Sequence, residues 1–129
     1  MEKQNRQQEE LDVLYKDQIR LDLQLEDNQD EQKALRLLRE DLEYSQGDVL
    51  YQLNDLLLMG VTPSHRSFYI QLLEQMDETT RKLFLDLDEQ ELQLKQQYRE
   101  TERQLEIVQK KRSQLINELA EKEAKKNRF

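Results

Sequence analysis

The residues that could take part in chemistry are few and scattered. The chain has one histidine, His65, and no cysteine, so it offers neither a disulfide framework nor a thiolate metal site. No second histidine and no serine-centred elbow accompany His65 to complete a catalytic triad or a metal site. His65 follows Pro63 closely, which places it in the first turn of a predicted helix, where a solvated imidazole is expected.

Carboxylates are abundant, because the chain has 28 acidic residues. Carboxylate catalysis needs a pocket that excludes water and shifts the pKa of one group, and extended helices provide no such pocket. We therefore expect no enzyme, no catalytic residue, and no bound cofactor or metal.

Basic residues gather near the end of the sequence, where residues 110–128 include Lys110, Lys111, Arg112, Lys122, Lys125, Lys126 and Arg128. A nucleic-acid interface would need such a patch, but the overall net charge of −8 repels phosphate. No aromatic residue lies among these cations to stack on bases. We therefore expect no nucleic-acid partner.

The composition predicts long helices. Of 129 residues, 37% are charged and 36% hydrophobic, and only two glycines and one proline are present. Good helix formers with so few breakers are typical of a coiled coil, and the apolar periodicity described below argues against disorder. No apolar run reaches membrane-spanning length and no leader-like segment is recognisable, so we expect a cytoplasmic protein without membrane insertion.

The segment Leu56–Ser64 predicts the turn of an all-α antiparallel helical hairpin. Gly60 favours a helix end, Pro63 a helix start, and Thr62 the N-cap between them. We expect a single hairpin domain over residues 1–129, with helices over about 4–59 and 64–126 and the turn at 60–63. Gly47 is the second candidate break, and we expect a continuous helix there, with Gly47 as the place for a kink.

Heptad repeats predict how the two arms pair. The first arm repeats at Leu14, Leu21, Asn28, Leu35, Leu42, Val49 and Leu56, with a partly polar companion row three residues earlier. The second arm repeats as follows: Leu73, Thr80, Leu87, Leu94, Thr101, Val108 and Leu115, with companions four residues on, beginning at Asp77. The arms should close on each other along these rows, forming an elongated hairpin of ~90 Å at 1.5 Å per residue. A symmetric fold-back would set residue i opposite residue 123 − i.

More apolar side chains surround the turn than two helices can bury against each other. Consecutive apolar residues point to all sides of a helix, so some must stay exposed unless a partner covers them. We expect the partner-binding surface to comprise Leu50, Leu57, Leu58, Met59, Phe68, Tyr69 and Ile70. A homodimer that buries the same surface is the alternative.

Two stretches carry a family resemblance. The turn Leu58-Met59-Gly60 resembles the small apolar-x-Gly turn of the WXG-type proteins of Gram-positive type VII secretion. The segment Phe84–Glu89, which runs into a Gln-, Glu- and Arg-rich coil, resembles small adaptors encoded beside LXG-domain toxins. The chain departs from the WXG pattern because it has no tryptophan at the turn and longer arms.

The resemblance implies an adaptor or targeting chaperone that acts by protein–protein interaction. It would bind the helical N-terminal domain of an LXG toxin, together with a second small helical adaptor, for export by a leaderless type VII route. The family's export signal is an aromatic residue followed four residues later by an acid, and Tyr98 with Glu102 is the best-placed of four matches. The alternative function is a coiled-coil stalk of a flagellar or type III export ATPase, which would use the free ends of the arms, or a homodimeric helical scaffold.

Overall fold

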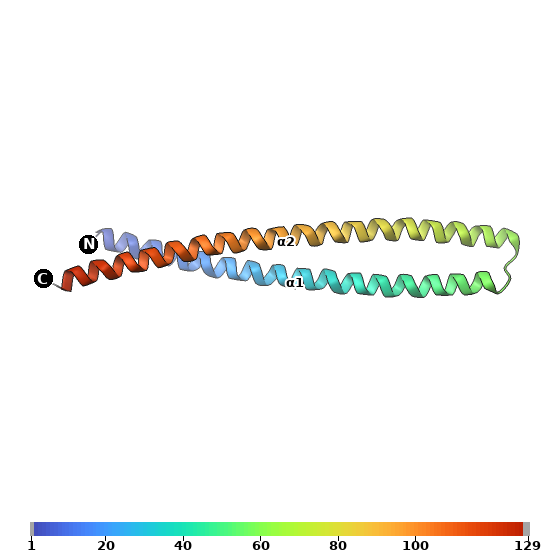
Figure 1. Ribbon diagram of the computed structural model, residues 1–129, viewed down its shortest axis with the longest axis horizontal. Coiled ribbons are helices and arrows are strands. Elements are labelled where there is room, and N and C mark those ends of the chain that lie inside the picture. Colours follow the sequence, from blue (N-terminus) through green and yellow to red (C-terminus); the bar gives the residue numbers. More distant parts are fainter. Residues whose placement is uncertain (1, 128–129) are drawn as a thin grey trace. The chain divides into compact units, whose positions relative to one another are not determined.

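The computed structural model describes residues 2–127 and consists of two helices joined by a short loop (Figure 1). Helix α1 spans Glu2–Leu58 and helix α2 spans Pro63–Asn127, and the described residues include no strand. The predicted all-α helical hairpin is confirmed. Each observed helix end lies within two residues of its predicted position, and α1 continues through Gly47 without a break. Glycine within a helix lowers its stability but does not prevent it from forming.

The loop forms because the backbone of Gly60 suits a helix end and that of Thr62 suits a helix start. Gly60 has a φ of 86°, a left-handed conformation that glycine adopts without steric cost. The backbone N–H of Met59 donates to the carbonyl of Asp55 over 3.1 Å and closes the last turn of α1. At the start of α2, the N–H of Arg66 donates to the carbonyl of Thr62 over 2.9 Å, as expected of an N-cap residue. The predicted turn at Gly60–Pro63 is confirmed.

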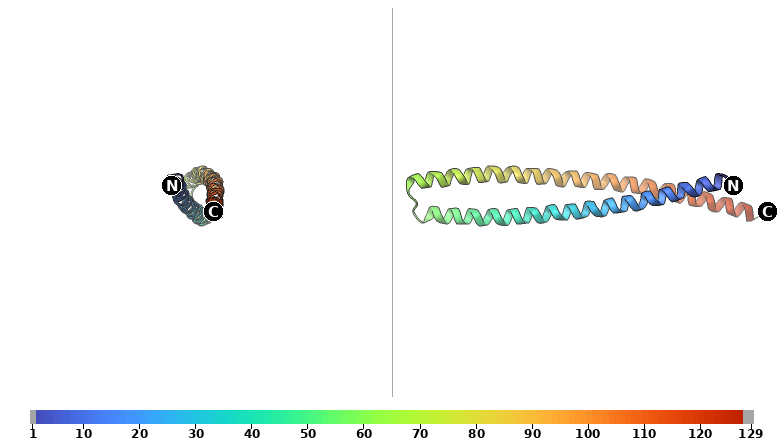
Figure 2. Two further views of the ribbon diagram at one scale, coloured as in Figure 1. Left: turned by 90° about the vertical axis from the view of Figure 1, so that its left-hand side faces the viewer. Right: turned by 180° about the vertical axis from the view of Figure 1, so that it is seen from behind.

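The packing divides the chain into two units, which we name by their position in the sequence. The terminal unit contains residues 2–30 of α1 and 95–127 of α2, and the turn unit contains residues 31–94. Within each unit a segment of α1 packs antiparallel against a segment of α2, as the right-hand view of Figure 2 shows.

In the terminal unit the inward-facing residues follow the predicted heptads. Leu21 is 1% exposed and Leu115 is 7% exposed, while Asn28, at 9%, is a buried polar residue in the same row. The other inward-facing side chains are half-buried at Leu11, Leu14, Gln18, Leu25, Tyr98, Thr101, Leu105, Val108, Arg112 and Leu119. The alternating three- and four-residue spacing keeps these side chains on one face of each helix.

Polar side chains link the two helices of the terminal unit. Gln29 Nε2 donates to the Tyr98 hydroxyl over 3.1 Å, and Lys122 Nζ donates to Gln7 Oε1 over 3.1 Å. In a third link, Arg112 Nη1 donates to Gln18 Oε1. These bonds supplement an apolar seam that the sequence dilutes with polar residues.

In the turn unit Leu53 and Leu87 form the most buried part of the core, each 8% exposed. Arg39, from a polar seam position on α1, pairs with Asp88 of α2, and its guanidinium carbon lies 5.6 Å from the centroid of the Phe84 ring. The aromatic face and the carboxylate together accommodate a charged residue at a position that normally holds an apolar one.

The seam of the turn unit departs from the predicted rows. Val49 and Leu56 are 38% and 43% exposed, and the adjacent Leu50 and Leu57 are half-buried in their place. On α2, Asp77 is exposed and Met76 is half-buried. The predicted seam positions at Val49, Leu56 and Asp77 are therefore corrected by one residue.

The one-residue shift of the inward-facing positions has a geometric cause on both helices. The inward-facing residues are spaced by four and again by four at Leu42–Gln46–Leu50 and at Met76–Thr80–Phe84. An extra four-residue step of this kind locally unwinds a coiled coil, because 3.6 residues per turn do not match a strict 3.5-residue repeat. A small hollow of about 180 Å³ lies at this point, with Gln46 and Thr80 in its lining.

The register also differs from the symmetric fold-back. The residue numbers of side-chain pairs hydrogen-bonded between the helices add to 127 for Gln29–Tyr98 and Arg39–Asp88, and to 129 and 130 for the pairs nearer the helix ends, whereas the prediction required 123. Arg103 Nη1 lies 3.7 Å from Glu100 on its own helix. The symmetric assumption placed the two helix ends level with each other, but a sum of 127 sets Leu58 level with residue 69, so residues 63–68 of α2 extend past it.

Candidate functional site

Four apolar side chains at the turn are exposed, and we call them the turn cluster. They are Leu58 (86% exposed), Met59 (78%), Phe68 (60%) and Ile70 (41%). The turn cluster exists because residues 56–59 are all apolar and cannot all face α2. Phe68 and Ile70 are two residues apart and therefore face different sides of α2, so the four residues share the turn region and not a single helix face. Exposed apolar side chains near one turn are candidates for a protein-binding surface.

The remaining predicted partner-binding residues lie elsewhere. Leu50, Leu57 and Tyr69 are half-buried and belong to the seam of the turn unit, so they stabilise the hairpin. Tyr69 also meets Phe68 edge to face, with ring centroids 5.7 Å apart and an interplanar angle of 69°. This contact holds the Phe68 ring beside the seam while 60% of the residue stays exposed.

The predicted seam residues are distributed over both units. Leu21, Leu87 and Leu115 are buried. The half-buried ones are Leu14, Leu35, Leu42, Leu73, Leu94 and Val108. Val49 and Leu56 are exposed for the reason given above.

The candidate export signal lies partly in the seam. Tyr98 is half-buried and its hydroxyl accepts the hydrogen bond from Gln29, whereas Glu102 is exposed. Two of the other matches, Tyr44 with Asp48 and Tyr51 with Asp55, lie on α1 and are far more open, because the two tyrosines are 80% and 72% exposed. Exposure therefore favours the pairs on α1 over Tyr98 and Glu102 as a recognition element.

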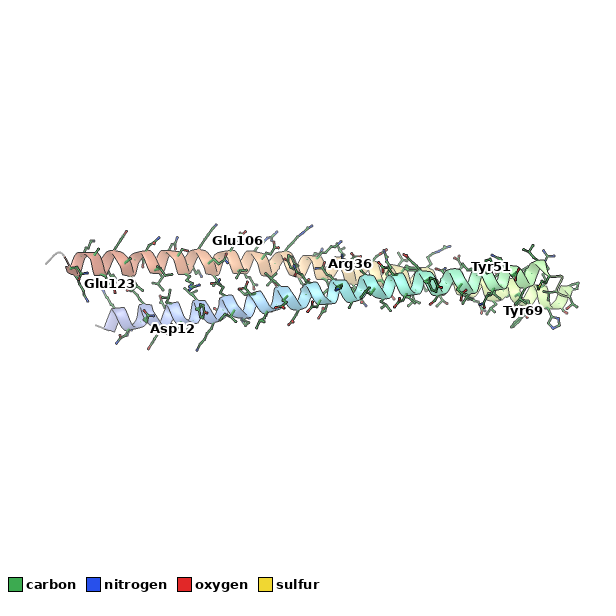
Figure 3. The ribbon with its side chains drawn as sticks, turned by 90° about the horizontal axis from the view of Figure 1, so that it is seen from below. Asp12, Arg36, Tyr51, Tyr69, Glu106 and Glu123 are labelled. Atoms are coloured by element: carbon green, nitrogen blue, oxygen red, sulfur yellow. The ribbon has the colours of Figure 1, made fainter. Side chains whose placement is uncertain are left out.

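A second apolar row follows the outer face of α1 in the turn unit, and we call it the outer row. It consists of Leu37 (53% exposed), Tyr44 (80%), Tyr51 (72%) and Leu58 (86%). Figure 3 views the turn unit from the side of α1 that faces away from α2, where Tyr51 is labelled. Sequence reasoning missed this row because it assigned the seven-residue repeat to one seam only. The signal that could have found it is a second apolar repeat at the same spacing.

The terminal unit has a groove of about 650 Å³ between the two helices. Leu14 and Leu115 belong to its apolar lining. The charged side chains in the lining are Arg6, Glu9, Glu10, Lys111 and Glu118. The mixture of signs suits a polar protein segment better than a small apolar ligand.

No three His, Cys, Asp or Glu side chains among residues 2–127 are grouped so that they could hold a metal ion. The ring of His65 contacts the hydroxyl of Thr62 at the start of α2, on an exposed surface. Over the described part of the chain, neither helix is long and apolar enough to span a membrane.

Comparisons with protein-family models, with curated proteins and with solved structures found no match to the chain. The exposed apolar residues of the turn unit and the groove of the terminal unit are therefore the basis for a functional assignment.

Proposed function

We propose that the chain is a non-enzymatic adaptor, or targeting chaperone, that binds a helical protein client through the turn cluster. The supporting observation is the exposure of Leu58, Met59 and Phe68, each between 60% and 86%, beside the turn, where neither helix covers them. Covering apolar side chains of this size is favourable by roughly 25 cal/mol per Å² of buried area. A client helix is the natural cover, because it can place apolar side chains along a convex helical surface.

The proposed client is the helical N-terminal domain of an LXG-type toxin, in a complex that a second small helical adaptor completes for type VII export. The support for this choice is the resemblance of Leu58-Met59-Gly60 and of Phe84–Glu89 to the small proteins of those systems. On this proposal the chain acts in the cytoplasm, and it leaves the cell, if it does, by the leaderless type VII route.

The test is co-expression of the full chain with the helical N-terminal domain of the toxin encoded beside it. We expect a stable complex in size-exclusion chromatography. The double variant Met59→Glu, Phe68→Glu should weaken binding at least a hundredfold, because it places charge where the client removes water. Circular dichroism should remain unchanged, since both side chains are exposed.

The matched control is Leu85→Glu, Leu92→Glu, which changes two residues of α2 that are 62% and 57% exposed and lie away from the turn. Its affinity for the client should equal that of the wild type. Binding that is indifferent to Met59→Glu, Phe68→Glu would remove the turn cluster from the function. Leu57 and Tyr69 are unsuitable for this test, because charges at half-buried seam residues would also weaken the hairpin.

A second candidate function is a stalk of a flagellar or type III export ATPase, and the groove of the terminal unit favours it. This function places the contacts at the free ends of the helices, where the groove is lined from both helices. Residues 1, 128 and 129 of those ends lie outside the described residues. Reversal of charge at Lys111 and Glu118 should abolish binding to the ATPase ring and leave binding of a toxin domain unchanged, which separates the two functions.

A further inference from the structure

The outer row gives α1 apolar residues on two opposite faces. Its four members recur every seven residues, a spacing that returns to nearly the same side of a helix with a drift of ~20° per repeat. All four lie in the turn unit, and the buried Leu53 faces the other way, towards α2. In a two-helix hairpin the second helix can cover only one apolar face of the first, so the other apolar face of α1 stays exposed.

The outer row has a row of acids along one side. Asp41, Asp48 and Asp55 each follow a member of the outer row by four residues, which places them next to it on the helix surface. All three are exposed, and none forms an ion pair with a residue that the structure describes. Residues 40–58 contain five acids and no lysine or arginine, so α1 itself supplies no cation to this row.

Gly47 lies on the opposite side of the outer row from these acids. Gly47 lies one helical turn from both Tyr44 and Tyr51, and a Cβ atom added there would meet nothing within 4 Å. Glycine in the middle of a helix lowers helix stability, and α1 nevertheless passes through this position unbroken. The missing side chain leaves room between the two tyrosines for an aliphatic side chain of a partner.

We propose that the outer row is the docking site for an amphipathic helix that has aliphatic residues at heptad spacing and lysine or arginine beside them. This inference rests on the proposed function, because it names the chemistry of the helical partner. The acidic row favours a partner helix with basic residues beside its apolar ones. Opposite charges across an interface fix the register, and like charges disfavour the wrong partner.

The outer row is large enough for three heptads. From Leu37 to Leu58 the helix advances 21 residues, or ~32 Å at 1.5 Å per residue. A tyrosine offers roughly 150–250 Å² of surface, so Tyr44 and Tyr51 at their observed exposure present on the order of 300 Å² together. That area alone matches the largest apolar patch on many monomers, a patch that often has a function.

A second copy of the chain is a poorer occupant than a basic helix. It would present the same face, on which residues 40–58 have no cation to meet Asp41, Asp48 and Asp55. In an antiparallel pair related by a two-fold axis, the two acidic rows would lie next to each other. Like charges at such short range weaken association.

The experiment uses the full chain and a fluorescently labelled synthetic peptide of three heptads, with leucine at a and d and lysine at e and g. The comparison peptides are a scrambled version of the same composition and a version with glutamate at e and g. In anisotropy titrations at physiological salt, the lysine heptad peptide should bind at least tenfold more tightly than either comparison peptide. Tyr44→Gln, Tyr51→Gln should weaken that binding at least tenfold without loss of helicity.

Two further variants separate docking on the outer row from general attraction between opposite charges. Asp48→Lys, Asp55→Lys should transfer the preference to the glutamate peptide. Leu85→Gln, Leu92→Gln on α2 should leave the affinity unchanged. Equal binding of the scrambled peptide, or binding that ignores the tyrosine variants, overturns the proposal. Self-association of the chain that Tyr44→Gln, Tyr51→Gln abolishes in sedimentation equilibrium also overturns it, because a second copy is then the occupant.

Failure of the outer row as a docking site can be distinguished from failure of the proposed function. If the heptad peptide fails to bind while Met59→Glu, Phe68→Glu still disrupts the client complex, the docking site is wrong and the proposed function stands. If the peptide binds as expected and no toxin domain forms a complex with the chain, the docking site stands and the proposed client is wrong.

Discussion

Arg112 of α2 lies over the ring of Tyr15 of α1, with its guanidinium carbon 4.9 Å from the ring centroid. Its Nη1 donates to Gln18 Oε1 over 2.9 Å, but its buried Nε has no hydrogen-bond partner among the described residues. The residue occupies an inward heptad position, where an apolar side chain would normally pack. The interactions with Tyr15 and Gln18 therefore offset only part of the cost of burying this cation.

Replacing Arg112 with leucine should stabilise the hairpin by about 1 kcal/mol, because the change removes an unsatisfied buried donor and adds apolar packing. The midpoint of thermal unfolding, followed by circular dichroism, should rise by about 3–5 °C. Arg103→Leu is the control, since the Arg103 side chain is 74% exposed, and its effect should stay within about 0.5 kcal/mol. A lower midpoint for Arg112→Leu would show that the contact with Tyr15 outweighs the buried donor.

Leu21→Ala and Leu23→Ala form a matched pair two residues apart in α1. Leu21 is 1% exposed, and its truncation should cost about 2–4 kcal/mol through lost burial and an unfilled cavity. Leu23 is 54% exposed, and its truncation should cost under about 1 kcal/mol. Urea unfolding measures both, and similar losses for the two variants would contradict the assigned face of α1.

The two glycines should respond to alanine in opposite directions. Gly47→Ala should stabilise α1 by about 0.5–1 kcal/mol, because Gly47 is helical and the added Cβ meets nothing within 4 Å. Gly60→Ala should destabilise the chain by about 1–2 kcal/mol, because a φ of 86° is unfavourable for a residue with a Cβ. Thermal unfolding of both variants checks the signs, and a stabilising Gly60→Ala would mean that the turn has a different backbone.

Leu56→Ala and Leu57→Ala test the one-residue shift of the seam. Leu57 is half-buried against α2, so its truncation should cost about 1–3 kcal/mol, whereas Leu56, at 43% exposed, should cost less than half as much. Denaturant midpoints distinguish the two. A larger loss of stability for Leu56→Ala than for Leu57→Ala would show that the heptad continues unbroken and that the extra four-residue step is absent.

The helices and the turn follow from local properties of the sequence. Gly60 and Pro63 have intrinsic backbone preferences, and the surrounding helix formers leave no other place for the chain to reverse. The seam of the terminal unit is equally predictable, because its inward-facing residues, most of them apolar, keep a strict three- and four-residue spacing from Leu11 to Asn28 and from Tyr98 to Leu119. The seam of the turn unit is less predictable, because near the turn Val49, Leu50, Leu56 and Leu57 are all apolar and pattern alone does not show which pair faces inward.

The sequence by itself determined two helices, their ends and the heptad face that closes the terminal unit, because these depend on backbone propensity and on spacing along one helix. Only the tertiary structure decided that Leu50 and Leu57 face α2, that Gln29 meets Tyr98, and that the outer row stays exposed. These outcomes depend on how two helices slide and rotate against each other. Neighbouring registers differ only slightly in packing energy, and that difference is the sum of many weak contacts between the two helices. No short stretch of sequence is therefore enough to predict the register.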